Sequence, residues 1–367
     1  MSFTPPPYPY ERLDHLKELA SRHEGGPVDA SIGTPIDPPP QFVVDELAKA
    51  TGARGYPASA GSAQYREACV GWLGRRFSVD LDASDLAACV GTKEFVASLA
   101  GYLRLRWPQC DTVLFPATSY PTYAMSATLA GLRGVPVPMG ETGLDLSSVS
   151  EEDAARALVL WSNSPSNPTG SLDDLGAVAR WGRDHDVLVA SDECYAEYTW
   201  TGEPHTILES GSQGVLAVHS ASKRSNLAGL RAGFYAGDGD VVAYLRAVRQ
   251  HAGLMVPGPV QGAVAAAYGD DEHVAVQRER YRGRLDALAS ALNAFGVDAP
   301  FPDGSFYLWC SRDGDDGWSL AAALADAAGL VVSPGDLYGD AGAAHVRIAL
   351  VISDEQAARV VERLKAA

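Results

Sequence analysis

Polar side chains able to do chemistry follow three short apolar segments, at residues 157–161, 187–190 and 215–219. They comprise an amide, a carboxylate, a phenol, hydroxyls, a lysine and a guanidinium: Asn167, Asp192, Tyr195, Ser220, Ser222, Lys223 and Arg231. If the apolar segments are parallel strands, their carboxyl ends meet at one edge of a sheet, where open α/β sheets bind ligands. We therefore expect these groups to share one site.

This set of groups fits a phosphorylated aldehyde cofactor. A lysine can form a Schiff base with the aldehyde, and an acid can hold the pyridine nitrogen protonated so that the ring accepts electrons. Hydroxyl and guanidinium groups bind phosphate. The signatures of dinucleotide sites, P-loops, zinc proteases and α/β-hydrolases (G-x-G-x-x-G, G-x-x-x-x-G-K-[ST], H-E-x-x-H and G-x-S-x-G) are absent from the sequence.

Composition narrows the classes of partner. The chain of 367 residues has 29 Lys+Arg against 46 Asp+Glu, a formal net charge of −17. We therefore expect no nucleic acid and no membrane surface as partner, because both need a basic footprint. Five scattered cysteines without a C-x-x-C pair favour reduced thiols over a disulfide framework, and we expect no metal site. The first residues lack the features of a signal peptide, so a cytoplasmic location is expected.

The elements that must position these groups indicate an α/β protein. Between about residues 85 and 240, short apolar segments alternate with helical stretches, and candidate strands lie at 112–115, 157–161, 187–190, 215–219 and 233–236. Strands that are apolar on both faces are typical of a parallel sheet between two layers of helices. A long helix is predicted over 272–295, followed by strands at 305–309, 330–332 and 346–350. We predict an N-terminal arm at 1–40 packing with the small domain, a large domain at 41–255 and a small α+β domain at 256–367.

The order of the motifs resembles that of the fold-type I pyridoxal 5'-phosphate (PLP) aminotransferases of classes I and II. N-P-T-G at 167–170 is followed by D-x-x-Y at 192–195 and S-x-S-K at 220–223, with an arginine eight residues later. Further matches lie upstream and downstream: Gly33, Tyr56, Gly91-Thr92-Lys93, Tyr120, Pro334-Gly335, Tyr338-Gly339 and Arg347. The resemblance covers the whole chain and implies a three-layer α/β/α PLP-transferase fold, with a mostly parallel sheet and a smaller C-terminal α+β domain.

The resemblance also implies a role for each matching residue. Lys223 would hold PLP covalently and carry the catalytic proton, and Asp192 would pair with the pyridinium nitrogen. Tyr195 and Asn167 would donate hydrogen bonds to the ring oxygen, and Tyr120 would stack on the ring. The phosphate would be bound by Ser220, Ser222, Arg231, the backbone amides of Thr92 and Lys93, and Tyr56 of the neighbouring subunit in a homodimer with shared sites. Gly33 and Arg347 would bind the substrate, with Arg347 holding its α-carboxylate.

A finer cue concerns the substrate. The segment S-K-R-S-N at 222–226 resembles the bacterial N-succinyldiaminopimelate aminotransferases of lysine and peptidoglycan-precursor synthesis, and SIGTPIDPPP at 31–40 resembles their actinobacterial branch. Glutamate would then donate the amino group and N-succinyl-2-amino-6-oxopimelate would accept it. Both substrates carry more than one carboxylate, so a second cation should face the pocket, and the candidates are Arg54, Lys93 and Arg224.

Other functions stay open at this point. The enzyme could be an aminotransferase for aspartate, an aromatic amino acid or LL-diaminopimelate, or a PLP-dependent C–S β-lyase, because the β-lyases share the same motifs. A cofactor-binding regulator without catalysis is a third class. Such regulators usually carry a basic DNA-binding domain, which an acidic chain with a short N-terminal arm does not offer.

Overall fold

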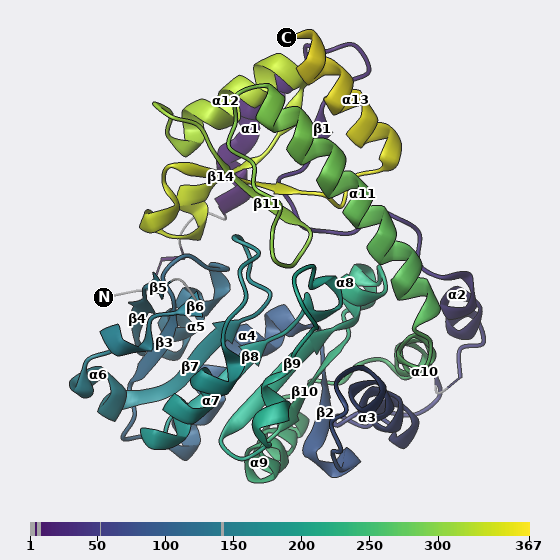
Figure 1. The fold of residues 1–367 in the computed structure, drawn as a ribbon. Coiled ribbons are helices and arrows are strands. Elements are labelled where there is room, and N and C mark those ends of the chain that lie inside the picture. The colour runs from purple at the N-terminus through teal and green to yellow at the C-terminus, as the bar shows by residue number, and fades with distance from the viewer. Residues whose placement is uncertain (1–3, 6–8, 52, 141–142) are drawn as a thin grey trace.

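The fold has two bodies joined by one long helix (Figure 1). A computed structural model describes residues 4–5, 9–51, 53–140 and 143–367. The larger body is built on a seven-stranded sheet, and the smaller one carries the C-terminal helices and the described start of the chain. Within the described residues, no helix is long and apolar enough to cross a membrane.

The large sheet has the strand order β2-β10-β9-β8-β7-β3-β4. Its strands are β2 (Leu86–Cys89), β3 (Thr112–Pro116), β4 (Arg133–Val137), β7 (Ala157–Asn163), β8 (Leu188–Asp192), β9 (Val215–Ser220) and β10 (Gly233–Gly237). All pairs are parallel except those of β10, which runs antiparallel to both β9 and β2. The predicted α/β fold with a mainly parallel sheet is confirmed. The expected strand at 187–190 begins one residue later and continues to Asp192, which places that carboxylate at the end of the strand.

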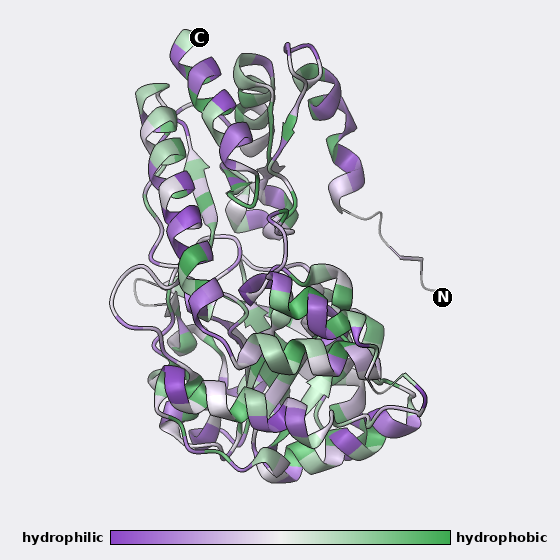
Figure 2. Ribbon diagram, turned by 90° about the vertical axis from the view of Figure 1, so that its right-hand side faces the viewer, coloured by the Kyte–Doolittle hydropathy of each residue, from purple (hydrophilic) through white to green (hydrophobic). Residues whose placement is uncertain are grey.

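Helices cover both faces of this sheet, as its fully buried strands require. One apolar cluster joins the sheet to α2 (Gln41–Ala48), α3 (Ala63–Phe77), α7 (Leu175–Asp184) and α10 (Gly258–Tyr268). A second cluster joins it to α4 (Thr92–Arg106), α5 (Thr122–Ala130) and α9 (Gly239–His251). The surface helices carry hydrophilic and hydrophobic residues in alternation (Figure 2), which is the pattern of helices with one face on a core. Two short helices, α6 (Glu151–Arg156) and α8 (Ala221–Arg224), precede β7 and follow β9.

The smaller body has its own apolar core. It contains α1 (Asp14–Ala20), α12 (Gly317–Ala328), α13 (Asp354–Ala366) and a sheet of β11 (Tyr307–Ser311), β14 (His345–Ala349) and β13 (Ser333–Pro334). The strand β1 (Val28–Asp29) pairs in parallel with β12 (Leu330–Val331). The described part of the predicted N-terminal arm thus holds a helix and a strand, and both contribute to the core of the smaller body. The domain boundaries at 40 and 255 stay predictions.

The helix α11 (Glu272–Ala294) spans 23 residues and connects the two bodies (Figure 1). Its second half contributes Leu285, Leu288 and Leu292 to the core of the smaller body. The short strands β5 (Met139–Gly140) and β6 (Gly143–Leu144) pair antiparallel. The helix and the neighbouring loops bring the C-terminal strand β14 opposite the carboxyl ends of β7, β8 and β9.

Candidate active site

A cavity of about 400 Å³ lies where the two bodies meet. Twelve of the thirteen predicted site residues line it: Gly33, Thr92, Lys93, Tyr120, Asn167, Asp192, Tyr195, Ser220, Ser222, Lys223, Arg231 and Arg347. The thirteenth, Tyr56, is 99% exposed on a loop outside the cavity. Within the described residues, the fold therefore brings together every predicted group that was expected to come from a single subunit.

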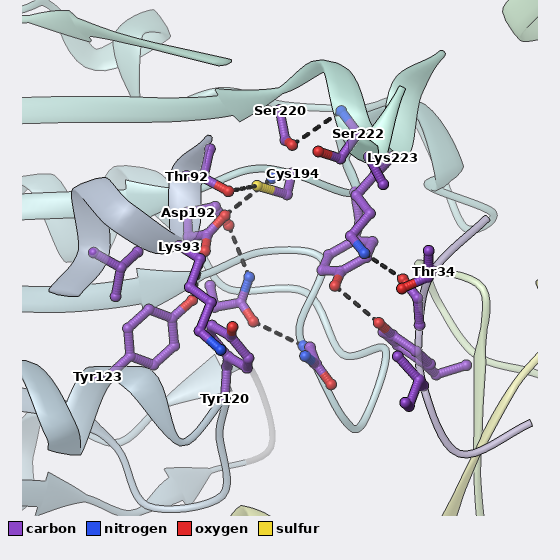
Figure 3. A pocket seen from close by; sticks show the side chains of 18 of the residues that line it. Thr34, Thr92, Lys93, Tyr120, Tyr123, Asp192, Cys194, Ser220, Ser222 and Lys223 are labelled. Carbon is purple, nitrogen blue, oxygen red and sulfur yellow. Dashed lines mark hydrogen bonds between the residues drawn. The ribbon is translucent and has the colours of Figure 1, made fainter. Parts of the chain in front are cut away.

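Lys223 is one of the two lysines that line the cavity, and it lies opposite Lys93 in the close view (Figure 3). It lies on α8, directly after β9, and Ser220 caps that helix by accepting a hydrogen bond of 3.1 Å from the Ser222 N–H. The Lys223 carbonyl accepts a hydrogen bond of 2.9 Å from the Tyr198 hydroxyl, and the Nζ donates to the Gly33 carbonyl. Burial lowers the pKa of Lys223 from 10.5 to about 8. A larger fraction of neutral amine is therefore present near neutral pH than for an exposed lysine, as a nucleophilic lysine needs.

Asp192 is the buried carboxylate at the end of β8. Its Oδ2 accepts a hydrogen bond of 2.8 Å from the Tyr123 hydroxyl, and its Oδ1 accepts one of 3.2 Å from the Cys194 N–H. Burial raises the pKa of Asp192, while these donors act in the opposite direction. A buried acid held by donors on both oxygens is suited to face a cationic ring nitrogen, because the opposite charge favours its ionised form.

The start of α4 forms a cradle for an anion. Gly91 precedes the helix with φ +76°, and a Cβ there would lie 2.2 Å from the Arg231 Nη2 atom. The N–H groups of the first turn and the Arg231 guanidinium are therefore close together, which is the arrangement that binds phosphate at helix N-termini. Ser220 and Ser222 also line the cavity.

Arg347 is the cation at the opposite, C-terminal wall of the cavity. It is 1% exposed on β14, and its Cζ lies 4.3 Å from the Tyr307 ring centroid and 4.8 Å from that of Tyr338. Its Nη1 donates to the Asn167 Oδ1 at 2.8 Å and its Nη2 to the Ser31 carbonyl at 2.5 Å. Among the described residues no carboxylate pairs with it, and its Nε has no partner. A buried guanidinium that lacks an anionic partner is suited to bind the carboxylate of a ligand.

The three candidates for a second cation differ in place. Lys93 lines the cavity, with its Nζ 6.0 Å from the Tyr120 ring centroid. Arg54 is exposed outside it. Arg224 is buried in the large body, where it pairs with Glu197 at 3.0 Å and Asp271 at 2.7 Å. Arg224 therefore forms structural ion pairs and does not line this cavity.

The contacts of Asn167 and Tyr195 were not foreseen. The Asn167 amide oxygen accepts a hydrogen bond from Arg347. The Tyr195 hydroxyl forms a hydrogen bond of 2.9 Å with the Tyr307 hydroxyl. Gly33 permits this arrangement, since a Cβ at that position would lie 2.1 Å from the Tyr307 hydroxyl oxygen. Both residues remain in the cavity wall.

Sequence reasoning missed nine residues that line the cavity, among them Tyr10, Tyr123, Cys194 and Tyr307. Tyr123 lies three residues after Tyr120, and this Y-x-x-Y spacing at a helix start was the available signal. Cys194 lies between Asp192 and Tyr195, and its Sγ donates to the Thr92 hydroxyl at 3.3 Å. Tyr10 and Tyr307 come from segments that only the tertiary fold brings to this wall.

A second cavity of about 380 Å³ lies beside α2 and the start of α11. It contains a hydrogen-bonded chain in which His273 lies between the Ser225 hydroxyl, at 2.9 Å, and an Asp270 carboxylate oxygen, at 2.5 Å. The same Asp270 oxygen accepts the His273 backbone N–H, as a residue before a helix commonly does. Ser225 is 2% exposed. This chain of contacts ties α8 to the start of α11.

The donor set of the main cavity fits PLP. It offers an amine for the aldehyde, a buried carboxylate for the ring nitrogen and an anion cradle for the phosphate, in addition to a separate guanidinium for a substrate carboxylate. The anion cradle requires glycine at position 91, because a Cβ there would collide with the Arg231 guanidinium. The described residues hold no cluster of His, Cys, Asp and Glu suited to a metal ion.

Comparison with known proteins agrees with this chemistry. The sequence profile of "Aminotransferase class I and II" matches residues 28–364. The chain is 44% identical to a probable aminotransferase of Mycobacterium tuberculosis, over 98% of this chain and 85% of that protein. It is 43% identical to the 4-dedimethylamino-4-oxo-anhydrotetracycline transaminase OxyQ of Streptomyces rimosus, over 98% and 99%.

More distant relatives bear on the substrate. The LL-diaminopimelate aminotransferase of Aquifex aeolicus is 32% identical over 98% of this chain and 96% of its own length. The solved structure of a probable N-succinyldiaminopimelate aminotransferase from Thermus thermophilus superposes with a TM-score of 0.87 at 29% identity, covering 98% of this chain and 100% of that one.

Proposed function

Because this chain belongs to the class I and II aminotransferases, which are PLP-dependent transferases, we propose that it exchanges an amino group between glutamate and N-succinyl-2-amino-6-oxopimelate. The observation that carries the proposal is the buried Arg347, which has no carboxylate partner among the described residues and shares its cavity with Lys223 and Asp192. An amino acid binding here would place its α-carboxylate at one end of the cavity and its amino group toward the lysine.

The residues of the cavity divide the work. When bound, PLP supplies an electron sink: its ring takes up the electron pair that remains at the substrate Cα after the proton leaves. Lys223 is proposed to hold the cofactor and to move that proton, for which an amine with a pKa near 8 is suited. Asp192 holds the charge of the ring nitrogen, and the start of α4 with Arg231 fixes the phosphate. Arg347 orients the substrate so that the Cα faces the lysine.

The proposed acceptor rests on two sequence and structure likenesses. The sequence S-K-R-S-N at 222–226 and the likeness to the Thermus thermophilus structure favour a diaminopimelate-type substrate. Lys93 is the cation that lines the cavity and could meet a distal carboxylate. Aspartate, aromatic and LL-diaminopimelate transamination and C–S β-lysis are the alternatives that the same experiment separates.

A second candidate function comes from the likeness to OxyQ. The 43% identity extends over 99% of that transaminase, whose name describes an oxo group on an anhydrotetracycline as the acceptor. An acceptor of that kind is a ring ketone without an α-carboxylate, so Arg347 would act on the amino donor alone. Ring ketones therefore belong in the substrate panel.

We also propose that the enzyme is a homodimer. Tyr56 is 99% exposed, and Ile36, Phe42 and Val44 are exposed apolar side chains within twenty residues of it in the sequence. A second copy would cover exposed apolar side chains of this kind and carry its Tyr56 to the phosphate cradle of the first. The oligomeric state is directly measurable by sedimentation.

The function is tested by a half-reaction followed by a substrate panel. Glutamate alone should change the absorption of the bound cofactor and release 2-oxoglutarate, and Lys223→Ala should do neither. In the reverse direction, N-succinyl-LL-diaminopimelate should then be the best amino donor, with 2-oxoglutarate as the acceptor. A preference for an aromatic or branched amino acid or a ring ketone would overturn the substrate, and release of pyruvate and ammonia from cystathionine would identify a lyase.

A further inference from the structure

We propose that Tyr10 is a substrate-binding residue whose hydroxyl completes, together with Arg347, the pocket for the α-carboxylate. The inference rests on the proposed function in one respect, namely that Arg347 binds a carboxylate. The chain brings Tyr10 to this wall across 337 positions of sequence, so that the described start of the chain supplies part of the site.

The contacts of Tyr10 place its hydroxyl at the guanidinium. The Tyr10 oxygen lies 3.5 Å from the Arg347 Nη2 atom and 3.3 Å from the Tyr338 hydroxyl oxygen. Tyr338 is itself buried, and its ring lies against the Arg347 guanidinium. The two phenols and the guanidinium therefore form one polar cluster, and both Tyr10 and Arg347 line the cavity.

The backbone next to Tyr10 is held in place by contacts of the residues that follow it, Arg12 and Leu13. Two residues later, Arg12 pairs with Asp336 at 3.1 Å, and its Cζ lies 4.7 Å from the Trp318 ring centroid. The next residue, Leu13, is fully buried in the core of the smaller body. Anchors on the adjacent turn hold the phenol in place, so its position does not depend on the substrate.

The chemistry of the cluster suits a carboxylate. A carboxylate has two oxygens, and the Arg347 terminal nitrogens already share their hydrogen bonds with Asn167 and Ser31. An additional hydroxyl at the same end can donate to one carboxylate oxygen while its own oxygen accepts from the guanidinium or from Tyr338. Hydrogen bonds to a charged group are stronger than those between neutral groups, and burial of the cluster increases the difference.

The proposal predicts a selective effect of Tyr10→Phe, which keeps the ring and removes the hydroxyl. In the glutamate half-reaction, the apparent dissociation constant of glutamate should rise about 10- to 150-fold, the range expected for losing one hydrogen bond to a charged group. The limiting rate should change less than threefold, because the hydroxyl is not near the transferred proton. The affinity for PLP should be unchanged.

A binding measurement separates this proposal from the reaction itself. Isothermal titration of the holoenzyme with glutarate, which has the carboxylates of glutamate but no amino group, should show the same loss of affinity in Tyr10→Phe. The matched control is Tyr244→Phe, which removes the hydroxyl that donates to the Tyr102 carbonyl at 2.7 Å and should leave glutarate affinity unchanged. If the unsubstituted enzyme fails to react with any amino acid, the proposed function is wrong, yet glutarate binding still tests Tyr10.

A donor without a carboxylate supplies the last arm of the test. With 2-phenylethylamine, Tyr10→Phe should react at the same slow rate as the unsubstituted enzyme. An equal loss with glutamate and with the amine would show that the substitution acts through the fold. An unchanged glutarate affinity in Tyr10→Phe would overturn the proposal.

Discussion

The Tyr123 hydroxyl donates a hydrogen bond of 2.8 Å to the Asp192 carboxylate, and both side chains are buried. Tyr123 lies in the first turn of α5, three residues after Tyr120, whereas Asp192 ends β8. The bond therefore links the start of α5 to the carboxylate at the end of β8. Since this donor lowers the pKa of a carboxyl that burial raises, it favours the ionised state of Asp192.

We expect Tyr123→Phe to weaken cofactor binding. Without this donor the Asp192 pKa rises further, so the carboxylate is a weaker partner for the ring nitrogen. The dissociation constant of PLP should increase about 3- to 10-fold, corresponding to the net loss of one buried hydrogen bond. Fluorescence titration of the apoenzyme with PLP measures it. Tyr244→Phe, which loses a hydroxyl contact outside the cavity, should bind PLP normally.

Substitution of Lys223 by methionine should stabilise the apoenzyme. Burial depresses the pKa of the folded lysine to about 8 from 10.5, so between these values the unfolded chain binds more protons than the folded one. The free energy of unfolding of the unsubstituted protein therefore rises with pH across this interval, and below pH 8 the full penalty for burying the ammonium is present. Lys223→Met should gain up to about 3 kcal/mol at pH 7 and progressively less as the pH rises toward 10.

Urea unfolding of both apoproteins at pH 7 and pH 10 checks this expectation. The control is Lys365→Met on the exposed end of α13, which should change little at either pH. A gain for Lys223→Met that grows with pH would contradict the depressed pKa of this lysine.

Gly33→Ala should damage the substrate end of the site. The new Cβ would lie 2.1 Å from the Tyr307 hydroxyl oxygen, so the ring must move and its hydrogen bond with Tyr195 is lost. We expect kcat/KM for glutamate to fall at least about 10-fold, since misplacement of a positioned group by 1 Å can cost two orders of magnitude. Gly283→Ala on α11, where a Cβ meets nothing within 4 Å, should keep full activity. Equal activities of the two variants would show that Tyr307 adapts freely.

Shared sites in a homodimer predict complementation between inactive variants. Tyr56→Ala should weaken phosphate binding in the partner's site, and Lys223→Ala should abolish activity in its own. In a hybrid dimer one site then carries both substitutions and the other carries neither. Refolding a 1:1 mixture should restore about a quarter of the activity of the unsubstituted dimer. Activity that never exceeds that of the two separate variants would indicate that Tyr56 serves its own subunit or none.

Much of the site was predictable because its polar residues follow buried strands in sequence. Asp192 and Lys223 stand at the ends of β8 and β9, and the apolar pattern of both strands is plain. The family motifs then ordered Thr92, Asn167 and Arg231. The apolar patterns and the motifs both describe the turn that follows a strand. They therefore predict the position of side chains that lie on such a turn.

The rest depends on contacts that periodicity does not encode. The antiparallel direction of β10 is decided by the path of the chain between β9 and β10 and by pairing with β2. The strand β4 was missed because its sequence, RGVPV, contains a glycine and a proline, which are tolerated at its place on the sheet edge.

The pairing of β1 with β12 and the contact of Tyr10 with Arg347 have a consequence for biosynthesis. A ribosome releases α1 and β1 early, whereas their partners on β12 and β14 emerge near the end of translation. Until then Leu13, Leu16 and Val28 have no core to enter, although the large sheet can already be complete. A nascent chain could therefore acquire the cofactor cradle before its carboxylate pocket, and chaperones would meet this N-terminal segment as an apolar surface that stays exposed until late in synthesis.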